Sequence, residues 1–205
     1  MKILYLGDSI TDCGKNTSAG SMLAIGQSYV MLTAARLAAD NPGKYEFVNQ
    51  GISGNRIVDL YARIKRDCWN YNPDLISILI GVNDVWHDIN HQNGVEADRF
   101  ERMYDTLLSD TKEKLSDVRF MIMEPFVLPG TATTAHWEEF EKETALRAAI
   151  AARLAEKYNA VWIPLQKRLT EAAGEYPELI TPDGVHPSIA GHQIIADAWL
   201  SAFPG

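Results

Sequence analysis

Short apolar runs alternate with longer amphipathic segments along this chain, and this alternation is what most restricts its fold. Each run is bounded by Gly, Pro, Asn or Asp, a pattern typical of strands buried on both faces. The segments between them carry apolar residues at helical spacing. Strand–helix–strand repetition predicts a parallel sheet with helices on both faces. The predicted strands are 2–6, 45–49, 75–80, 119–123 and 161–163, and the predicted helices are 27–39, 57–69, 98–115, 138–158 and 188–203.

The expected architecture is a three-layer α/β/α sandwich with about five parallel strands, as in flavodoxin-like folds. A chain of 205 residues fits one such domain, so we expect a single domain over 1–205. Its longest loops are predicted at 14–26, 86–97 and 124–136. These loops fall at the carboxyl ends of the strands, where open parallel sheets bind ligands.

The charge balance restricts the partners of the chain. With 19 Lys and Arg against 27 Asp and Glu, its net charge is −8 and it shows no basic stripe. This argues against nucleic-acid partners and against an anionic membrane surface. No apolar run approaches the roughly 20 residues of a membrane helix, and the apolar N-terminal run is too short for a signal peptide. We therefore expect a cytoplasmic protein.

The two cysteines, Cys13 and Cys68, are too few for a disulfide scaffold and fit no metal-binding spacing, so we expect free thiols. A metal site at Asp183 and His186, with His192 six residues further on, lacks another pair of suitably spaced ligands. We expect neither a metal nor another cofactor.

Polar blocks follow three of the predicted strands. The first block runs from Gly7 to Thr11 and carries Ser9, either a helix cap or a nucleophile. The second block, NQGISGN at 49–55, offers a backbone N–H or forms a plain turn. In the third block Asn83 either directs its amide toward a developing oxyanion or closes a turn on its own backbone.

A fourth block near the C-terminus reads Asp183-Gly184-Val185-His186. An acid three residues before a histidine can orient the imidazole and stabilise the imidazolium that forms when the histidine accepts a proton. Each block alone has an ordinary structural explanation. Together they supply a nucleophile, a base, an orienting acid and oxyanion donors at one edge of the sheet, as acyl transfer requires.

The blocks GDSIT, GISGN, GVND and DGVH, in this order, resemble those of the SGNH hydrolases, also called GDSL-type esterases. They extend from Gly7 to His186, nearly the whole chain. Ile10 replaces the leucine of the family's GDSL block, a conservative change. Within the family, the segments GDSITDCG, NQGISGNR, IGVNDVW and VHPSIAGH are most similar to carbohydrate esterases that remove acetyl groups from xylan and related oligosaccharides.

The resemblance implies a role for each matching position. Ser9 corresponds to the nucleophile, His186 to the general base and Asp183 to the acid that orients it. The oxyanion hole would consist of the Ser9 N–H, the Gly54 N–H and the Asn83 side chain. Such esterases are often oligomeric, so the resemblance allows a homo-oligomer without fixing its size.

The substrate pocket is less well defined by the sequence. We expect Asp8 and Trp86 to contact an ester substrate, because aromatic faces stack on sugars. His87, Asp88 and His91 either meet sugar hydroxyls or form a solvated loop face. Arg56 points toward the site or forms a surface salt bridge. On the last predicted helix, Ile194, Ile195 and Trp199 are expected in the core.

The leading hypothesis is a serine esterase that deacetylates xylo-oligosaccharides or related sugars. One alternative retains the catalytic residues but acts on lysophospholipids or thioesters. Another is a carbohydrate-binding module without catalysis, on a hydrolase scaffold. A nucleotide-binding flavodoxin-like protein would share the layers, but Asp8 and Asp12 after the first strand disfavour phosphate.

Overall fold

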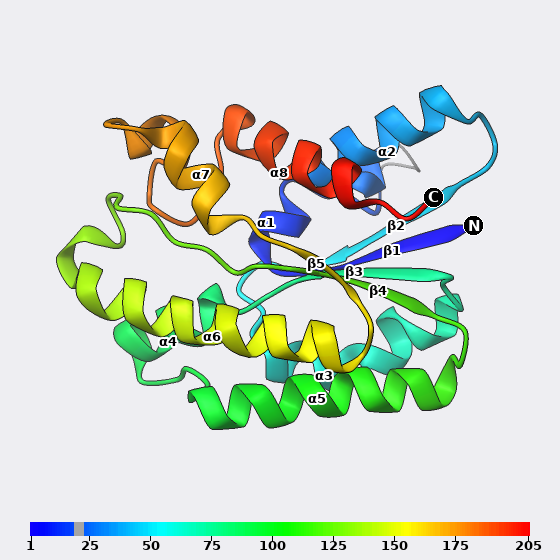
Figure 1. Cartoon of the computed structure of the whole chain (residues 1–205), viewed down its shortest axis with the longest axis horizontal. Coiled ribbons are helices and arrows are strands. Elements are labelled where there is room, and N and C mark those ends of the chain that lie inside the picture. Colours follow the sequence, from blue (N-terminus) through cyan, green and yellow to red (C-terminus); the bar gives the residue numbers. More distant parts are fainter. Residues whose placement is uncertain (19–22) are drawn as a thin grey trace.

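The computed structural model describes residues 1–18 and 23–205. At its centre lies a parallel sheet with the strand order β2-β1-β3-β4-β5 (Figure 1). The predicted α/β fold is confirmed. The strands are β1 (Lys2–Gly7), β2 (Glu46–Gly51), β3 (Leu75–Leu79), β4 (Arg119–Met123) and β5 (Val161–Ile163).

Helices cover both faces of the sheet. In Figure 1 one layer lies above the sheet and holds α1 (Ser9–Asp12), α2 (Tyr29–Asp40), α7 (Gln166–Ala173) and α8 (Ile189–Ala202). The other layer holds α3 (Ile57–Asp67), α4 (Val82–His91), α5 (Ala97–Lys114) and α6 (Trp137–Lys157). Short 3₁₀ helices lie at Leu23–Ile25, Trp69–Tyr71, Thr134–His136 and Pro177–Leu179.

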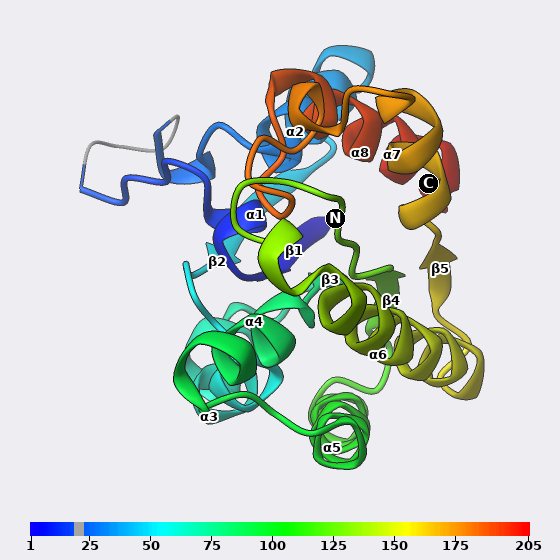
Figure 2. The same ribbon diagram turned by 90° about the vertical axis from the view of Figure 1, so that its left-hand side faces the viewer.

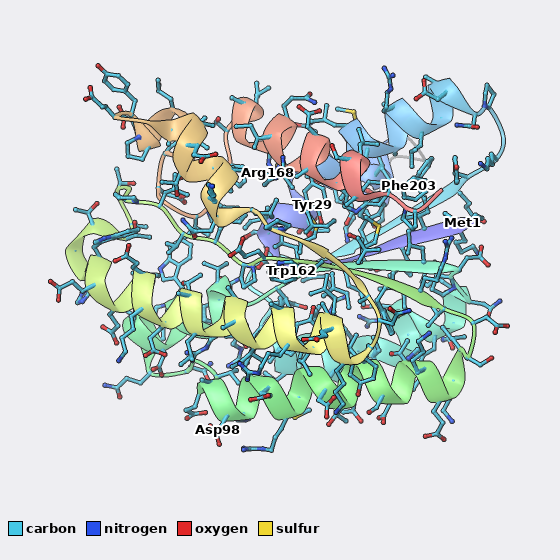
Figure 3. The ribbon with its side chains drawn as sticks, viewed as in Figure 1. Met1, Tyr29, Asp98, Trp162, Arg168 and Phe203 are labelled. Carbon is cyan, nitrogen blue, oxygen red and sulfur yellow. The ribbon has the colours of Figure 1, made fainter. Side chains whose placement is uncertain are left out.

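Alternate strand residues divide the core into two clusters, because successive side chains of a strand point to opposite faces. Ile3 and Tyr5 of β1 pack with α2 and α8, whereas Leu4 and Leu6 pack with α3 and α5. Trp199 of α8 is fully buried in the first cluster, as expected from the sequence. Tyr29 of α2 lies between this helix layer and the sheet (Figure 3).

The strands occur where the sequence predicts them, but two are not buried on both faces. Strands β2 and β5 form the edges of the sheet, and both are partly exposed. Each of them still packs on helices at both faces, because Phe47 and Ile163 pack with one core cluster and Val48 and Trp162 lie against the other. In Figure 3 Trp162 of β5 marks one of these edges.

The largest correction concerns the loop predicted at 86–97, because its first half is helix α4. The loop at 124–136 is largely irregular, as expected, until the 3₁₀ helix that ends it. The loop predicted at 14–26 includes residues 19–22, which lie outside the described part of the chain. Helices α1 and α7 were not predicted. Their 4 and 8 residues give little periodicity to detect.

The carboxyl ends of all five strands point to the edge of the sheet that faces the viewer in Figure 2. Both chain termini lie at the opposite end of the molecule (Figure 1). Within residues 1–18 and 23–205, none of the helices combines the length and the hydropathy that crossing a membrane demands. The loops after β1, β2 and β3 therefore meet at one edge.

Candidate active site

Ser9 is the first residue of α1, and one residue, Asp8, separates it from the end of β1 at Gly7. Asp8 caps this helix, because its Oδ1 accepts a hydrogen bond of 2.9 Å from the N–H of Ile10. The short strand-to-helix turn leaves Ser9 partly exposed at the carboxyl edge while its neighbours Asp8 and Ile10 are buried. A side chain at this turn sits beside unpaired backbone N–H groups of a helix N-terminus.

A chain of hydrogen bonds joins Ser9 to His186 and Asp183. The distance from Ser9 Oγ to His186 Nε2 is 2.7 Å, and that from His186 Nδ1 to Asp183 Oδ2 is 2.6 Å. Asp183 Oδ1 also accepts hydrogen bonds from the backbone N–H groups of Val185 and His186. The acid and the imidazole are therefore oriented within one turn of chain, and this turn meets a serine 177 residues away in sequence.

The contacts of Asp183 and His186 shift their two pKa values in opposite directions. Burial alone would raise the pKa of Asp183, but hydrogen bonds from the ring and backbone of His186 and from the Val185 N–H lower it to about 2. The hydrogen bond to Asp183 raises the pKa of His186 above its ordinary value, against the opposing effect of burial. A carboxylate thus stays ionised beside an imidazole whose protonated form it favours.

Gly54 and Asn83 lie at the same hollow as Ser9. Gly54 has φ of +79°, a conformation in which glycine is favoured. Gly51, the other glycine of this block, donates its N–H to Asn49 Oδ1, whereas the Gly54 N–H has no hydrogen-bond partner within the described residues. Asn83 Nδ2 donates one hydrogen bond of 3.2 Å to the carbonyl of Asn55, which leaves its second amide hydrogen for a ligand.

The hollow at Ser9 has a volume of about 400 Å³. Trp86 forms one wall, with its ring centroid 5.7 Å from that of His186, and Phe140 supports it from behind at 6.3 Å. Much of the remaining wall is one face of α4. The hollow is lined by Ser9, Ser53, Gly54, Asn83, Trp86, His87, Asn90, His91 and His186.

Other residues singled out in the sequence lie elsewhere. Asp8 was expected to contact substrate, but it is completely buried and is not part of the wall; burial raises its pKa to about 7. Asp88 is exposed and also outside the hollow. Arg56 forms a salt bridge with Asp59 and donates to the Asn93 carbonyl, so the salt-bridge alternative holds.

Ser53, Asn55 and Asn90 belong to this neighbourhood, yet sequence reasoning did not single them out. Asn90 lies one helical turn beyond Trp86, so recognising α4 would have placed both on one face. The sequence offered one sign of this helix, because Asp84 is an acid in its first turn and acids are common at the start of helices.

The site shows no feature of a metal centre. Across residues 1–18 and 23–205, no three His, Cys, Asp or Glu side chains are grouped to hold a metal ion. His192 is buried and its Nδ1 accepts a hydrogen bond of 3.3 Å from the Tyr29 N–H. Cys13 and Cys68 are free thiols.

A larger hollow of about 560 Å³ lies between α6, β5 and α7. Alanines line much of it, and Glu124 stands at its wall. The Glu124 carboxylate accepts hydrogen bonds from the N–H groups of Leu165 and Gln166 at the start of α7. Among the described residues that line it, no hydroxyl is hydrogen-bonded to an imidazole, in contrast to the hollow at Ser9.

Comparison with known proteins finds one matching family and a similar esterase. Residues 5–194 match the GDSL-like lipase/acylhydrolase family. The chain is 34% identical to an acetylxylan esterase from Geobacillus stearothermophilus over 97% of its own length and 92% of that protein's.

Solved structures share the fold. A protein described as a GDSL-like lipase from Parabacteroides merdae has a TM-score of 0.92 at 35% identity, covering 98% of this chain and 94% of that one. A crystal structure of an acetylxylan esterase from Geobacillus stearothermophilus has a TM-score of 0.87 at 32% identity, covering 100% and 94%.

Proposed function

Because the chain belongs to the GDSL-like lipase/acylhydrolase family and is a carboxylic ester hydrolase, we propose that it removes acetyl groups from xylo-oligosaccharides or related sugars. Ser9 is the nucleophile of this proposal, His186 the general base and Asp183 the orienting acid. The observation that carries it is the unbroken chain of hydrogen bonds of 2.7 and 2.6 Å from Ser9 through His186 to Asp183.

The reaction has two steps. As the hydroxyl of Ser9 attacks the acetyl carbonyl, His186 Nε2 takes its proton and then delivers it to the departing sugar oxygen. Water then attacks the acetyl-enzyme while His186 accepts a proton from it; the bond between Ser9 Oγ and the acetyl carbon breaks, acetate leaves, and His186 returns the proton to Ser9 Oγ. Asp183 holds the Nδ1–H tautomer and stabilises the imidazolium in both steps.

The tetrahedral intermediate carries a negative oxygen that needs donors. We assign this role to the N–H groups of Ser9 and Gly54 and to the free amide hydrogen of Asn83. Their location at one hollow supports the assignment. Donors fixed before the reaction stabilise the developing charge without reorganisation.

The form of the hollow supports a small acyl group and a polar alcohol. Most side chains in its wall carry polar groups, with Ser53, Asn90 and the imidazoles of His87 and His91 around one indole. Trp86 offers an aromatic surface for a sugar ring. The similarity to a protein named acetylxylan esterase points to the same substrate class.

Acetate release from a panel of acetylated xylo-oligosaccharides tests the proposal. Wild-type protein should release acetate, and Ser9→Ala should abolish release while the far-UV circular dichroism stays unchanged. Ser109→Ala on α5, an exposed serine outside the site, is the matched control and should retain full activity. Near-full activity of Ser9→Ala would overturn the assignment of the nucleophile.

A second comparison separates the acyl specificities. Acetyl and octanoyl esters of one chromogenic alcohol should be hydrolysed with a clear preference for acetyl. Preference for octanoyl would favour a lysophospholipase or thioesterase. Failure of a fluorophosphonate to label Ser9 would favour a binding module without catalysis.

A further inference from the structure

Arg63 of α3 is a nearly buried cation close to the carboxyl ends of two strands. Its side chain is 9% exposed. Its Nη2 donates to the carbonyl of Gln50 at 2.9 Å, near the end of β2, and to that of Gly7 at 3.4 Å, at the end of β1. The guanidinium therefore ties the strand that leads to Ser9 to the strand that leads to Gly54.

The same side chain also holds Asn55. Arg63 Nε donates a hydrogen bond of 2.7 Å to Asn55 Oδ1. Asn55 directly follows Gly54, and its carbonyl accepts the 3.2 Å hydrogen bond from Asn83 Nδ2. Asn55 thus helps to place two of the proposed oxyanion donors. Gly54 is its neighbour in the chain, and Asn83 is hydrogen-bonded to its carbonyl.

A carboxylate fixes the guanidinium from the other side. Asp67 lies one turn further along α3, its side chain is 8% exposed, and its Oδ2 accepts from Arg63 Nη1 at 2.9 Å. With Asp67, Asn55 and the two carbonyls, every nitrogen of Arg63 has a partner. The planar guanidinium of Arg63 is therefore held in one position by its hydrogen-bond partners.

We propose that Arg63, anchored by Asp67, is a positioning residue for the oxyanion hole. It acts through Asn55 and touches neither the substrate nor Ser9. This role rests on the proposed function, because it presupposes that Gly54 and Asn83 stabilise the oxyanion. If Arg63 has this role, a change in α3 should weaken the stabilisation of the transition state more than it weakens substrate binding.

Arg63→Met removes every donor while keeping an unbranched side chain. We expect kcat for an aryl acetate to fall by about 10²-fold, the scale of a displacement near 1 Å at a reacting centre. KM should change less than kcat, because the change affects the transition state. Arg63→Lys, which keeps the charge but loses the fork, should recover only part of the rate.

Arg66→Met is the matched control. Arg66 lies on the same helix and pairs with the same carboxylate, Asp67, but its side chain is 74% exposed and, among the described residues, it has no hydrogen bond to a strand end. We expect kcat and KM of Arg66→Met to equal those of the wild type. A similar loss in both variants would show that Asp67 and α3 act only through stability, and would overturn the role of Arg63.

A double-mutant cycle with Asn83→Ala separates positioning from a merely structural effect. If Arg63 acts through this donor, Arg63→Met should lower kcat far less in the Asn83→Ala background than in the wild type, because coupled residues are not additive. Equal losses in both backgrounds would overturn the proposal.

Asn55→Leu provides a second variant if Arg63→Met fails to fold. It removes the acceptor of Arg63 Nε while the guanidinium keeps Asp67 and both carbonyls. It should reproduce the loss of kcat and the non-additivity with Asn83→Ala. An active wild type with a fully active Asn55→Leu would refute the positioning role alone, whereas an inactive wild type would refute the proposed function.

Discussion

At the scale of single residues, the site depends on a turn of four residues that orients its own acid and base. Asp183 accepts three hydrogen bonds from His186 and Val185, so the imidazole is aimed before it meets Ser9. This local construction explains why the block DGVH was informative in the sequence. The neighbours that are remote in sequence, such as Arg63 behind Asn55, could not be predicted, because they depend on how strands and helices pack.

The titration of His186 gives the first prediction. In the proposed mechanism the ring must be neutral to accept the proton of Ser9, so kcat/KM should fall as the pH drops through the pKa of His186. Since Asp183 raises that pKa, the midpoint should lie above the ordinary histidine value of about 6.5. Asp183 itself, with a pKa of about 2, stays ionised throughout.

Asp183→Asn tests the origin of this shift. The acid limb of the pH–rate profile should move to lower pH, and kcat should fall by about 10⁴-fold, as when the orienting carboxylate of such a triad is neutralised. Asp197→Asn, an exposed acid on α8, should change neither. An unmoved acid limb in Asp183→Asn would assign the limb to another group.

The second prediction concerns Asn83. Asn83→Ala removes a proposed oxyanion donor and should lower kcat by about 10²–10³-fold. The KM for an aryl acetate should stay close to that of the wild type, because the donor acts chiefly in the transition state. Steady-state kinetics check both values. A variant that raised KM and left kcat unchanged would place Asn83 in substrate binding instead.

At the scale of elements, helix α4 determines which side chains form the wall of the hollow. The sequence predicted a loop here, since polar residues dominate this stretch and its apolar positions are few. The acid Asp84 in the first turn and the stop at Gln92, whose φ is +52°, bound the helix instead. Its periodicity then brings Asn83, Trp86 and Asn90 to one side.

This face of α4 gives the third prediction. Asn90→Ala should raise KM for acetylated xylo-oligosaccharides while leaving kcat/KM for a small aryl acetate unchanged, because only the oligosaccharide reaches along the wall. Asp88→Ala, on the same helix but outside the hollow, is the control and should alter neither substrate. Equal effects of Asn90→Ala on both substrates would mean that the sugar part of the substrate does not bind along this face of α4.

The contact between α1 and β2 gives the fourth prediction. A methyl group on Gly51 would lie 2.4 Å from the backbone nitrogen of Asp12, so one strand must move away from the helix that begins with Ser9. Gly51→Ala should lower the free energy of unfolding by about 1–3 kcal/mol, the usual cost of overpacking. Urea unfolding measures this.

Gly43→Ala is the comparison for Gly51→Ala. Gly43 has φ of +78° with nothing within 4 Å of an added methyl group, so only backbone strain of about 1 kcal/mol is expected. Gly51→Ala should in addition reduce kcat, because α1 carries Ser9. A fully active Gly51→Ala would show that α1 and β2 adjust without moving Ser9.

At the scale of the whole molecule, a hydroxyl near the N-terminus meets an imidazole near the C-terminus because α1, which begins with Ser9, and α8, which follows His186, lie over the same face of the sheet. Helix α8 begins three residues after His186 and packs on α2. The sequence predicted this convergence from the order of four blocks and the rule that ligands bind at carboxyl ends. It did not predict which strands form the edges, because strand order depends on packing between distant segments.

Trp199 of α8 anchors this arrangement and provides the last prediction. Its Nε1 donates a 2.9 Å hydrogen bond to Ser77 Oγ of β3, and its ring centroid lies 5.6 Å from that of Tyr5 and 5.0 Å from that of Phe203. Trp199→Phe keeps an aromatic ring but leaves the buried hydroxyl of Ser77 without this donor. The free energy of unfolding should fall by about 1–3 kcal/mol.

Combining Trp199→Phe with Ser77→Ala separates the hydrogen bond from packing. If the unpaired hydroxyl causes the loss, the double variant should be more stable than Trp199→Phe alone, because removing both partners is less costly than removing one. Urea unfolding followed by circular dichroism measures all three stabilities. Under conditions in which they stay folded, Trp199→Phe and the double variant should have the kcat of the wild type, since Asp183 orients His186 locally. A double variant less stable than Trp199→Phe would attribute the anchoring of α8 to ring packing rather than to Ser77.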